Sequence, residues 1–61
     1  MSYYRHVKGG YYEFLYAARI ETTLQRVVVY RSCKDDSIWV RPESEFYDKF
    51  KPVPESQVTA T

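Results

Sequence analysis

The stretch YYRHVKGGYYEFLYAAR, residues 3–19, decides the fold because two strand-like segments flank a pair of glycines. Gly9 and Gly10 tolerate the positive φ angles that tight hairpin turns require. The segments on either side are rich in tyrosine and other residues that favour strands. We therefore predict strands over Tyr3–Val7 and Tyr11–Arg19, joined by a hairpin turn.

Alternation assigns the side chains of the second strand to two faces. One face would carry Tyr12, Phe14, Tyr16 and Ala18, and the other Tyr11, Glu13, Leu15, Ala17 and Arg19. A helical stripe of period 3.6 also fits part of this region, through Tyr12, Leu15, Tyr16, Ile20, Leu24, Val27 and Val28. We favour strands because β-branched and aromatic residues are poor helix formers and because two threonines interrupt the stripe.

The rest of the chain predicts two more strands and a short helix. Strands are expected over Gln25–Ser32 and Ile38–Arg41, with a turn at 34–37 between them. Pro42 suits the first position of a helical turn that runs to Phe50 and places Phe46 and Phe50 on one face. The predicted fold is all-β: a small SH3-like barrel or a strongly curved antiparallel sheet, with one short helical turn near the C-terminus. Residues 1–50 would form the domain, and residues 51–61 a flexible tail.

Composition limits how such a domain is stabilised. The chain has 61 residues, so its core is small, and one cysteine excludes a disulfide within the chain. One cysteine and one histidine do not make a zinc site, and we expect neither a metal nor a cofactor. Seven tyrosines exceed what a core of this size buries, which predicts a homo-oligomer.

Charge and hydropathy bear on partners and location. The formal net charge is +1, so extended contact with long nucleic acid is not expected. The sequence has no apolar run of the roughly 20 residues that a membrane helix needs, and its start does not resemble a secretory signal. A single thiol suits a reducing compartment, so we expect a cytoplasmic protein.

Two groups of residues are candidates for ligand binding. Arg5, His6 and Lys8 stand beside the glycine turn, where cationic side chains and free N–H groups suit an anion. The alternative is a solvated strand in which Arg5 pairs with Glu13.

Trp39 and Arg41 form the second group, because residues two apart in a strand project to the same face. A flat ring beside a guanidinium suits stacking on a base and binding of a phosphate. Alternatively, Trp39 fills the core and Arg41 pairs with Glu43 or Glu45. Arg31 would join Arg41 if the third and fourth strands pair, but three consecutive valines leave its face open.

Three separated blocks, YRHxKGxxYE from Tyr4, VVYR from Val28 and WVRP from Trp39, together with Phe46, resemble the domain-of-unknown-function family 1653. Its members are short proteins of bacteria and their phages, so a phage-encoded member would act in the host cytoplasm. The sequence departs from the family pattern at Ile20-Glu21-Thr22 and at Ser32-Cys33-Lys34. The resemblance implies a compact, barrel-like β fold and no established activity, cofactor or catalytic residue.

These features predict a non-catalytic binding module for a nucleotide or another small phosphate-bearing ligand. The candidate ligand-binding residues are Arg5, His6, Lys8, Arg31, Trp39 and Arg41. The alternatives are an SH3-like adaptor that binds a protein partner, or a weak nucleic-acid binder. An enzyme is not expected, because nothing in the sequence places Cys33 or a carboxylate beside His6.

Overall fold

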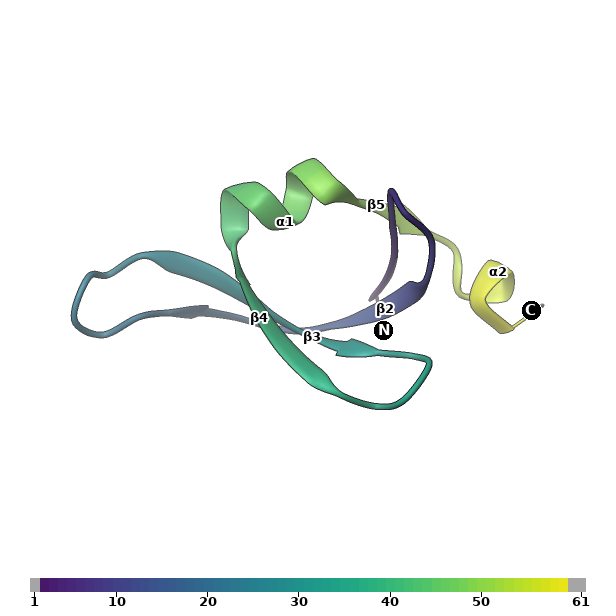
Figure 1. Ribbon diagram of the computed structural model, residues 1–61, viewed down its shortest axis with the longest axis horizontal. Coiled ribbons are helices and arrows are strands. Elements are labelled where there is room, and N and C mark those ends of the chain that lie inside the picture. The colour runs from purple at the N-terminus through teal and green to yellow at the C-terminus, as the bar shows by residue number, and fades with distance from the viewer. Residues whose placement is uncertain (1, 60–61) are drawn as a thin grey trace.

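The computed structural model describes residues 2–59 and shows a mostly β fold (Figure 1). Five antiparallel strands form one sheet in the order β4-β3-β2-β1-β5. The strands are β1 (Ser2–His6), β2 (Tyr11–Arg19), β3 (Arg26–Ser32), β4 (Ile38–Pro42) and β5 (Phe50–Val53). Two short helices, α1 (Glu43–Lys49) and α2 (Glu55–Thr59), complete the described chain.

The sheet is open, so the predicted SH3-like barrel or strongly curved sheet is wrong. β4 and β5 are the two edge strands and do not pair with each other. The chain passes from one edge to the other through α1, which lies across one face of the sheet (Figure 1). A helix therefore covers the core where a barrel would close through strand pairing. We call the face toward α1 the inner face and the opposite one the outer face.

The predicted strands and the glycine turn are confirmed. β2 has the predicted bounds, and the other three predicted strands differ by one residue at one or both ends. Gly9 and Gly10 have φ angles of 101° and 90°, in the region that favours glycine. The resulting hairpin pairs Arg5 with Tyr11 and Tyr4 with Tyr12. The helical alternative for residues 12–28 is wrong.

The predicted faces of β2 hold only for its first half. The β2–β3 register pairs Phe14 with Tyr30 but Tyr16 with Val29, so Leu15 is the extra residue of a β-bulge. An extra residue reverses the alternation that follows it. Tyr12 and Phe14 accordingly pack against the core, whereas Tyr16 is 68% exposed.

Aromatic rings form the core between the sheet and α1. Phe46 of α1 is fully buried and stacks on Phe50, with ring centroids 4.4 Å apart and planes 10° apart. Val28 and Tyr30 of β3 complete the buried cluster, against which Tyr4, Tyr12 and Phe14 pack. Phe46 and Phe50 thus pack together as predicted, but the helix ends at Lys49 and Phe50 is the first residue of β5.

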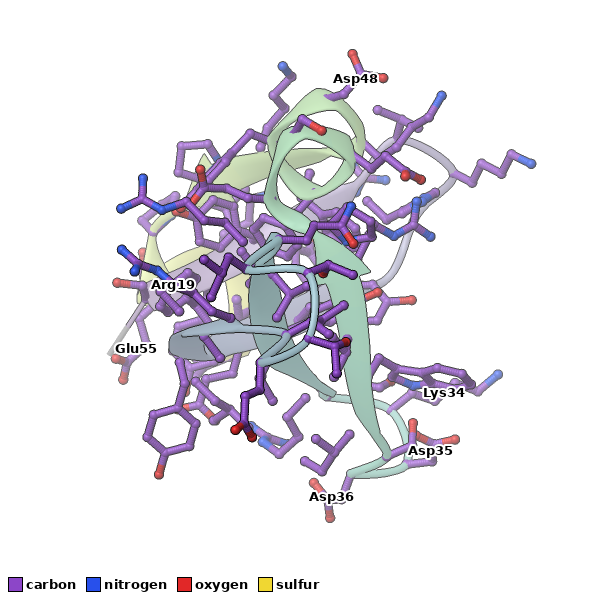
Figure 2. All side chains as sticks on the ribbon, turned by 90° about the vertical axis from the view of Figure 1, so that its left-hand side faces the viewer. Arg19, Lys34, Asp35, Asp36, Asp48 and Glu55 are labelled. Carbon is purple, nitrogen blue, oxygen red and sulfur yellow. The ribbon has the colours of Figure 1, made fainter. Side chains whose placement is uncertain are left out.

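The predicted helical turn after Pro42 corresponds to α1. Pro42 was predicted at the first helical position, but it is the N-cap residue, one position earlier. It makes no side-chain capping bond. Seven residues are too few for a stable isolated helix, so burial of Phe46 must hold α1 in place. Most charged side chains lie at the periphery, such as Asp48 of α1 and the turn residues Lys34, Asp35 and Asp36 (Figure 2).

The C-terminal segment differs from the predicted flexible tail. β5 includes residues 51–53 and pairs with β1 from Tyr3↔Val53 to His6↔Phe50, so the sheet extends past the predicted boundary at residue 50. Pro52 is tolerated because β5 is an edge strand. α2 follows, and Gln57 donates a hydrogen bond to the Tyr11 hydroxyl over 3.2 Å. The last two residues of the predicted tail, 60–61, lie outside the described residues.

Candidate functional site

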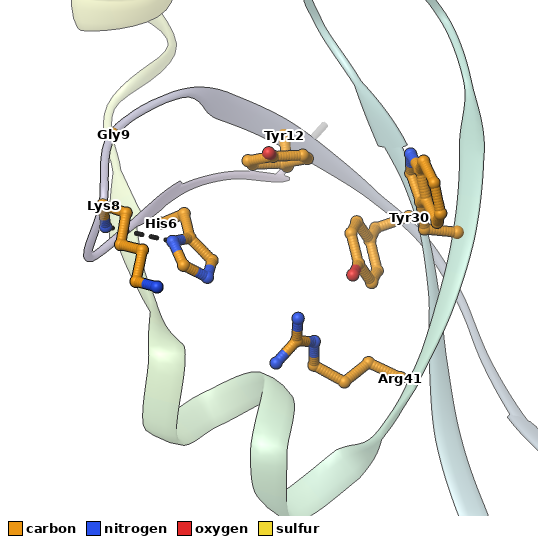
Figure 3. Close-up of a pocket in the computed structure, with 7 residues that line it drawn as sticks. His6, Lys8, Gly9, Tyr12, Tyr30 and Arg41 are labelled. Carbon is orange, nitrogen blue, oxygen red and sulfur yellow. Dashed lines mark hydrogen bonds between the residues drawn. The ribbon is translucent and has the colours of Figure 1, made fainter.

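A cavity of about 350 Å³ opens on the inner face beside the Gly9–Gly10 turn (Figure 3). The β1–β2 hairpin forms one side of this cavity, and β3 and β4 form the other. We call it the Arg41 cavity. Its lining residues are His6, Lys8, Gly9, Tyr12, Tyr30, Trp39 and Arg41.

His6 is fixed at the hairpin end of the cavity. It pairs with Phe50 across β1 and β5, and the two rings meet edge to face at 4.8 Å. The backbone N–H of Lys8 donates to His6 Nδ1 over 3.0 Å. Because Nδ1 accepts this bond, the neutral imidazole carries its proton on Nε2.

The electrostatic surroundings favour the neutral form of His6. Burial lowers the pKa of His6 below its ordinary value of 6.5, and the positive charges of Arg41, Lys8 and Lys49 lower it further. The imidazole therefore acts as a neutral N–H donor at neutral pH. The positively charged residues that line the cavity are Lys8 and Arg41.

Arg41 reaches the cavity from β4. It pairs with the buried Val28 of β3, and its guanidinium carbon lies 5.7 Å from the centroid of the Phe50 ring. Among residues 2–59, no carboxylate lies within ion-pairing distance of Arg41, so the suggested pairs with Glu43 or Glu45 are not formed. Figure 3 shows the guanidinium pointing toward the side of the cavity that carries His6. Its five N–H donors are thus available for an anion.

Aromatic rings line the rest of the cavity. Tyr12 and Tyr30 meet edge to face at 5.6 Å. Trp39 pairs with Tyr30, is 54% exposed, and donates its indole N–H to Ser37 Oγ over 2.7 Å. The indole is therefore oriented without being buried, which leaves much of its surface open to a ligand.

The structure brings four of the six predicted ligand-binding residues together and separates two. His6, Lys8, Trp39 and Arg41 line the Arg41 cavity. Arg5 and Arg31 project from the outer face, because each is adjacent in its strand to a residue of the inner face. The inner face thus brings together residues of both predicted groups. One arginine of each group, Arg5 and Arg31, lies on the outer face instead.

Arg31 is held by carboxylates on the outer face. Its Nε donates to Glu13 over 2.9 Å, and its Nη1 donates to Asp36 over 2.6 Å. The hydrogen bond with Glu13, and after it that with Asp36, raises the pKa of Arg31. Glu13 pairs with Arg31 across β2 and β3, so the suggested Arg5–Glu13 pair is replaced by this one. Arg31 thereby links β2, β3 and the following turn.

Arg5 belongs to another part of the outer face. Its guanidinium carbon lies 5.9 Å from the centroid of the Tyr11 ring, and its cross-strand neighbour on β5 is Lys51. A separate cavity of about 320 Å³ lies there, lined by Arg5, His6, Val7, Lys51, Val53 and Gln57. Arg5 therefore does not contribute to the Arg41 cavity.

The sequence prediction missed Tyr12, Tyr30 and Gly9. The signal for Tyr12 was present, since a two-glycine hairpin that pairs Tyr4 with Tyr12 places Tyr12 on the face of His6. Tyr30 had no such signal, because the preceding valines hide the alternation of β3. A prediction that Glu13 pairs with Arg31 across the strands would have placed Arg31 on the outer face and therefore Tyr30 on the inner face.

Other potential sites are limited within the described chain. Among residues 2–59, no three His, Cys, Asp or Glu side chains are grouped so as to hold a metal ion, and no helix is long and apolar enough to cross a membrane. Cys33 lines a different cavity, together with Tyr11 and Lys34, and its thiol accepts a 3.9 Å contact from Arg31.

A protein-family model described as "Protein of unknown function (DUF1653)" matches residues 2–57, and thus all five strands. The chain belongs to the DUF1653 family. No curated protein and no solved structure matches it. The matched range includes every residue that lines the Arg41 cavity of this DUF1653 protein.

Proposed function

We propose that this protein is a non-catalytic binding module that holds a nucleotide, or another small phosphate-bearing ligand, in the Arg41 cavity. The observation that carries the proposal is an arginine that has no carboxylate partner among residues 2–59 and that faces a histidine and a lysine across a cavity with aromatic walls. Such a site offers hydrogen-bond donors and positive charge to a phosphate, and aromatic rings to a base.

The polar groups of the cavity suit a phosphate. A guanidinium donates two parallel hydrogen bonds to phosphate oxygens, and an ammonium adds a point charge. Arg41 and Lys8 supply these groups from opposite sides of the cavity (Figure 3). Neutral His6 adds an N–H donor at Nε2 without requiring protonation.

The aromatic groups suit a base. Stacking of a base on an aromatic side chain contributes about 1–3 kcal/mol and tolerates any base. Trp39 lies next to Arg41 in the cavity and is more than half exposed. The volume of about 350 Å³ lies at the lower end of the range of roughly 300–1,000 Å³ for small-molecule sites. A single nucleotide fits this scale better than an extended polymer.

Calorimetric titration with adenosine monophosphate, inorganic phosphate and adenosine tests the proposal. We expect the monophosphate to bind more tightly than either fragment. Arg41→Ala should weaken its binding about tenfold to a hundredfold, because a charge-assisted contact contributes roughly 1.5–3 kcal/mol. Arg41→Lys should restore part of the loss, since an ammonium lacks the planar fork.

Arg19→Ala is the matched control, because it removes the same charge from an exposed position that lines a different cavity. It should leave the affinity within about twofold of the wild type, because salt screens the interaction between a distant exposed charge and the ligand. An equal loss of affinity in Arg41→Ala and Arg19→Ala would mean that the effect arises from net charge alone. That result would contradict the proposed site. A folded protein that binds no nucleotide or other phosphate-bearing compound, but binds an extended peptide or an oligonucleotide, would favour the adaptor or nucleic-acid alternative.

A further inference from the structure

The two edges of the sheet are protected very differently. β5 carries Pro52, which has no N–H to donate, and the exposed Lys51, and both features discourage pairing with another strand. β4 instead exposes three consecutive apolar residues: Ile38, Trp39 and Val40 are 55%, 54% and 59% exposed. An apolar edge with free backbone groups is a template for a further strand.

We propose that β4 pairs with β4 of a second copy of this chain, in antiparallel orientation about a two-fold axis. Such an interface is isologous, so the same residues meet from both sides and the assembly closes as a dimer. The two five-stranded sheets would become one continuous sheet through their β4 edges. The proposal does not depend on the ligand proposed for the Arg41 cavity.

One register suits the side chains best. In a continuous sheet, opposite residues must lie on the same face, so the axis passes through a residue of β4 and not between two residues. With the axis at Trp39, Ile38 lies opposite Val40 of the second copy, and Trp39 lies opposite its own equivalent. An axis at Ile38 would put Val40 opposite the charged Asp36. An axis at Val40 would put Ile38 opposite Pro42, which cannot donate to the ladder.

Charge complementarity favours a second copy as the occupant. With the axis at Trp39, Arg41 lies opposite Ser37 of the second copy, directly after the acidic residues Asp35 and Asp36. Antiparallel pairing therefore brings Arg41 of each copy near Asp35 of the other copy, while Asp36 stays bound to Arg31 of its own chain and Glu43 follows shortly after Arg41. Arg41 and Trp39 lie on the inner face, so the Arg41 cavities of the two copies become neighbours on one face.

The interface between two β4 strands is small. β4 has five residues, so the contact is smaller than the roughly 800 Å² per partner of standard stable interfaces. We therefore expect a weak, concentration-dependent dimer, with monomers at low concentration.

Sedimentation velocity from about 1 to 500 μM tests the dimer, a range chosen to span micromolar dissociation. Val40→Lys should weaken dimerisation at least tenfold, because each interface would gain two buried ammonium groups. Tyr16→Lys is the control, since Tyr16 is also more than half exposed but lies on the interior strand β2. A wild-type monomer at every concentration would overturn the proposal. A dimer that resists Val40→Lys and is lost in Tyr16→Lys would overturn it too, by placing the contact on the outer face.

Disulfide trapping tests the register in a Cys33→Ser background, where no other thiol remains. Ile38→Cys mixed with Val40→Cys should cross-link faster than either variant alone, because these positions lie opposite each other only with the axis at Trp39. Fastest cross-linking of Ile38→Cys with itself would overturn this register. The monomer–dimer result is read without ligand, so failure of nucleotide binding leaves it unaffected.

Discussion

At the scale of single residues, His6 links folding to pH. Its folded-state pKa lies below the ordinary value of 6.5, chiefly because of burial, whereas the unfolded chain takes up a proton near pH 6.5. Between these two pKa values the unfolded state binds more protons, so stability must fall as pH is lowered through this window. Above about pH 7.5, His6 contributes no pH dependence.

We therefore expect the melting temperature of the wild type to fall between about pH 7 and pH 5.5, above the range near pH 4 in which unperturbed Asp and Glu side chains titrate. His6→Asn keeps an acceptor for the Lys8 N–H and cannot titrate, so its melting temperature should stay nearly constant over that interval. The chain has one histidine, so an NMR titration of its ring assigns the pKa directly. A value above 6.5 in the folded protein would contradict the electrostatic environment described here.

Arg31 and Arg41 have opposite roles on the two faces of the sheet. Arg31→Ala leaves Glu13, whose side chain is 12% exposed, without its cation, which should cost about 1–3 kcal/mol of unfolding free energy. Arg41→Ala breaks no ion pair within the described residues 2–59 and should change stability by less than about 1 kcal/mol. Thermal or denaturant unfolding of both variants measures the contrast. Greater destabilisation by Arg41→Ala would make Arg41 a structural residue and remove the centre of the proposed site.

At the scale of elements, the glycine turn fixes both the first hairpin and one side of the cavity. Gly10 has φ +90°, and a Cβ there would meet Tyr12 Cε1 at 3.3 Å. Gly10→Ala should therefore destabilise the domain by about 1–2 kcal/mol. Gly9→Ala has the same kind of backbone strain but open space around its Cβ, so it should cost less. Equal melting temperatures of the two variants would show that the Tyr12 contact does not constrain the turn.

The two C-terminal elements differ in their importance for folding. In α2 only Val58 is partly buried, and one 3.2 Å hydrogen bond joins Gln57 to Tyr11, so removal of residues 55–61 should cost about 1 kcal/mol or less. Removal of residues 51–61 also deletes most of β5 and opens the β1 edge, and should prevent stable folding. Circular dichroism of both truncations measures this. A folded protein after the longer truncation would contradict the role of β5.

Local patterns predicted the strands but only part of their faces. The glycine pair, the tyrosine-rich segments and the spacing of Phe46 and Phe50 are local signals, and each corresponds to an element of the structure. The bulge at Leu15 arises from pairing between β2 and β3 and leaves no local signal, so the exposure of Tyr16 was not predictable. β5 was missed for the same reason. Lys51 and Pro52 disfavour a strand in isolation, and pairing with β1 overrides them.

At the scale of the whole molecule, the position of α1 explains both the fold and the cavity. α1 joins the two edges of the open sheet and buries Phe46 over part of the inner face. The Arg41 cavity lies on the same face, between the first hairpin and β4. The sequence predicted four residues of this site because the Arg5–Lys8 segment and the Trp39–Arg41 pair are local. Alternation along β1 already separates Arg5 from His6, whereas the face of Arg31 depends on the register between β2 and β3.

An NMR titration of the ¹⁵N-labelled protein with adenosine monophosphate tests the central claim, phosphate recognition in the Arg41 cavity, most directly. The largest shift changes should occur at the backbone amides of Lys8 and Gly9, the indole N–H of Trp39 and the side-chain Nε–H of Arg41. Gln57, on the far side of β1, should change little. Changes centred on Gln57 and Lys51, or none at millimolar nucleotide in the folded protein, would contradict the proposed site.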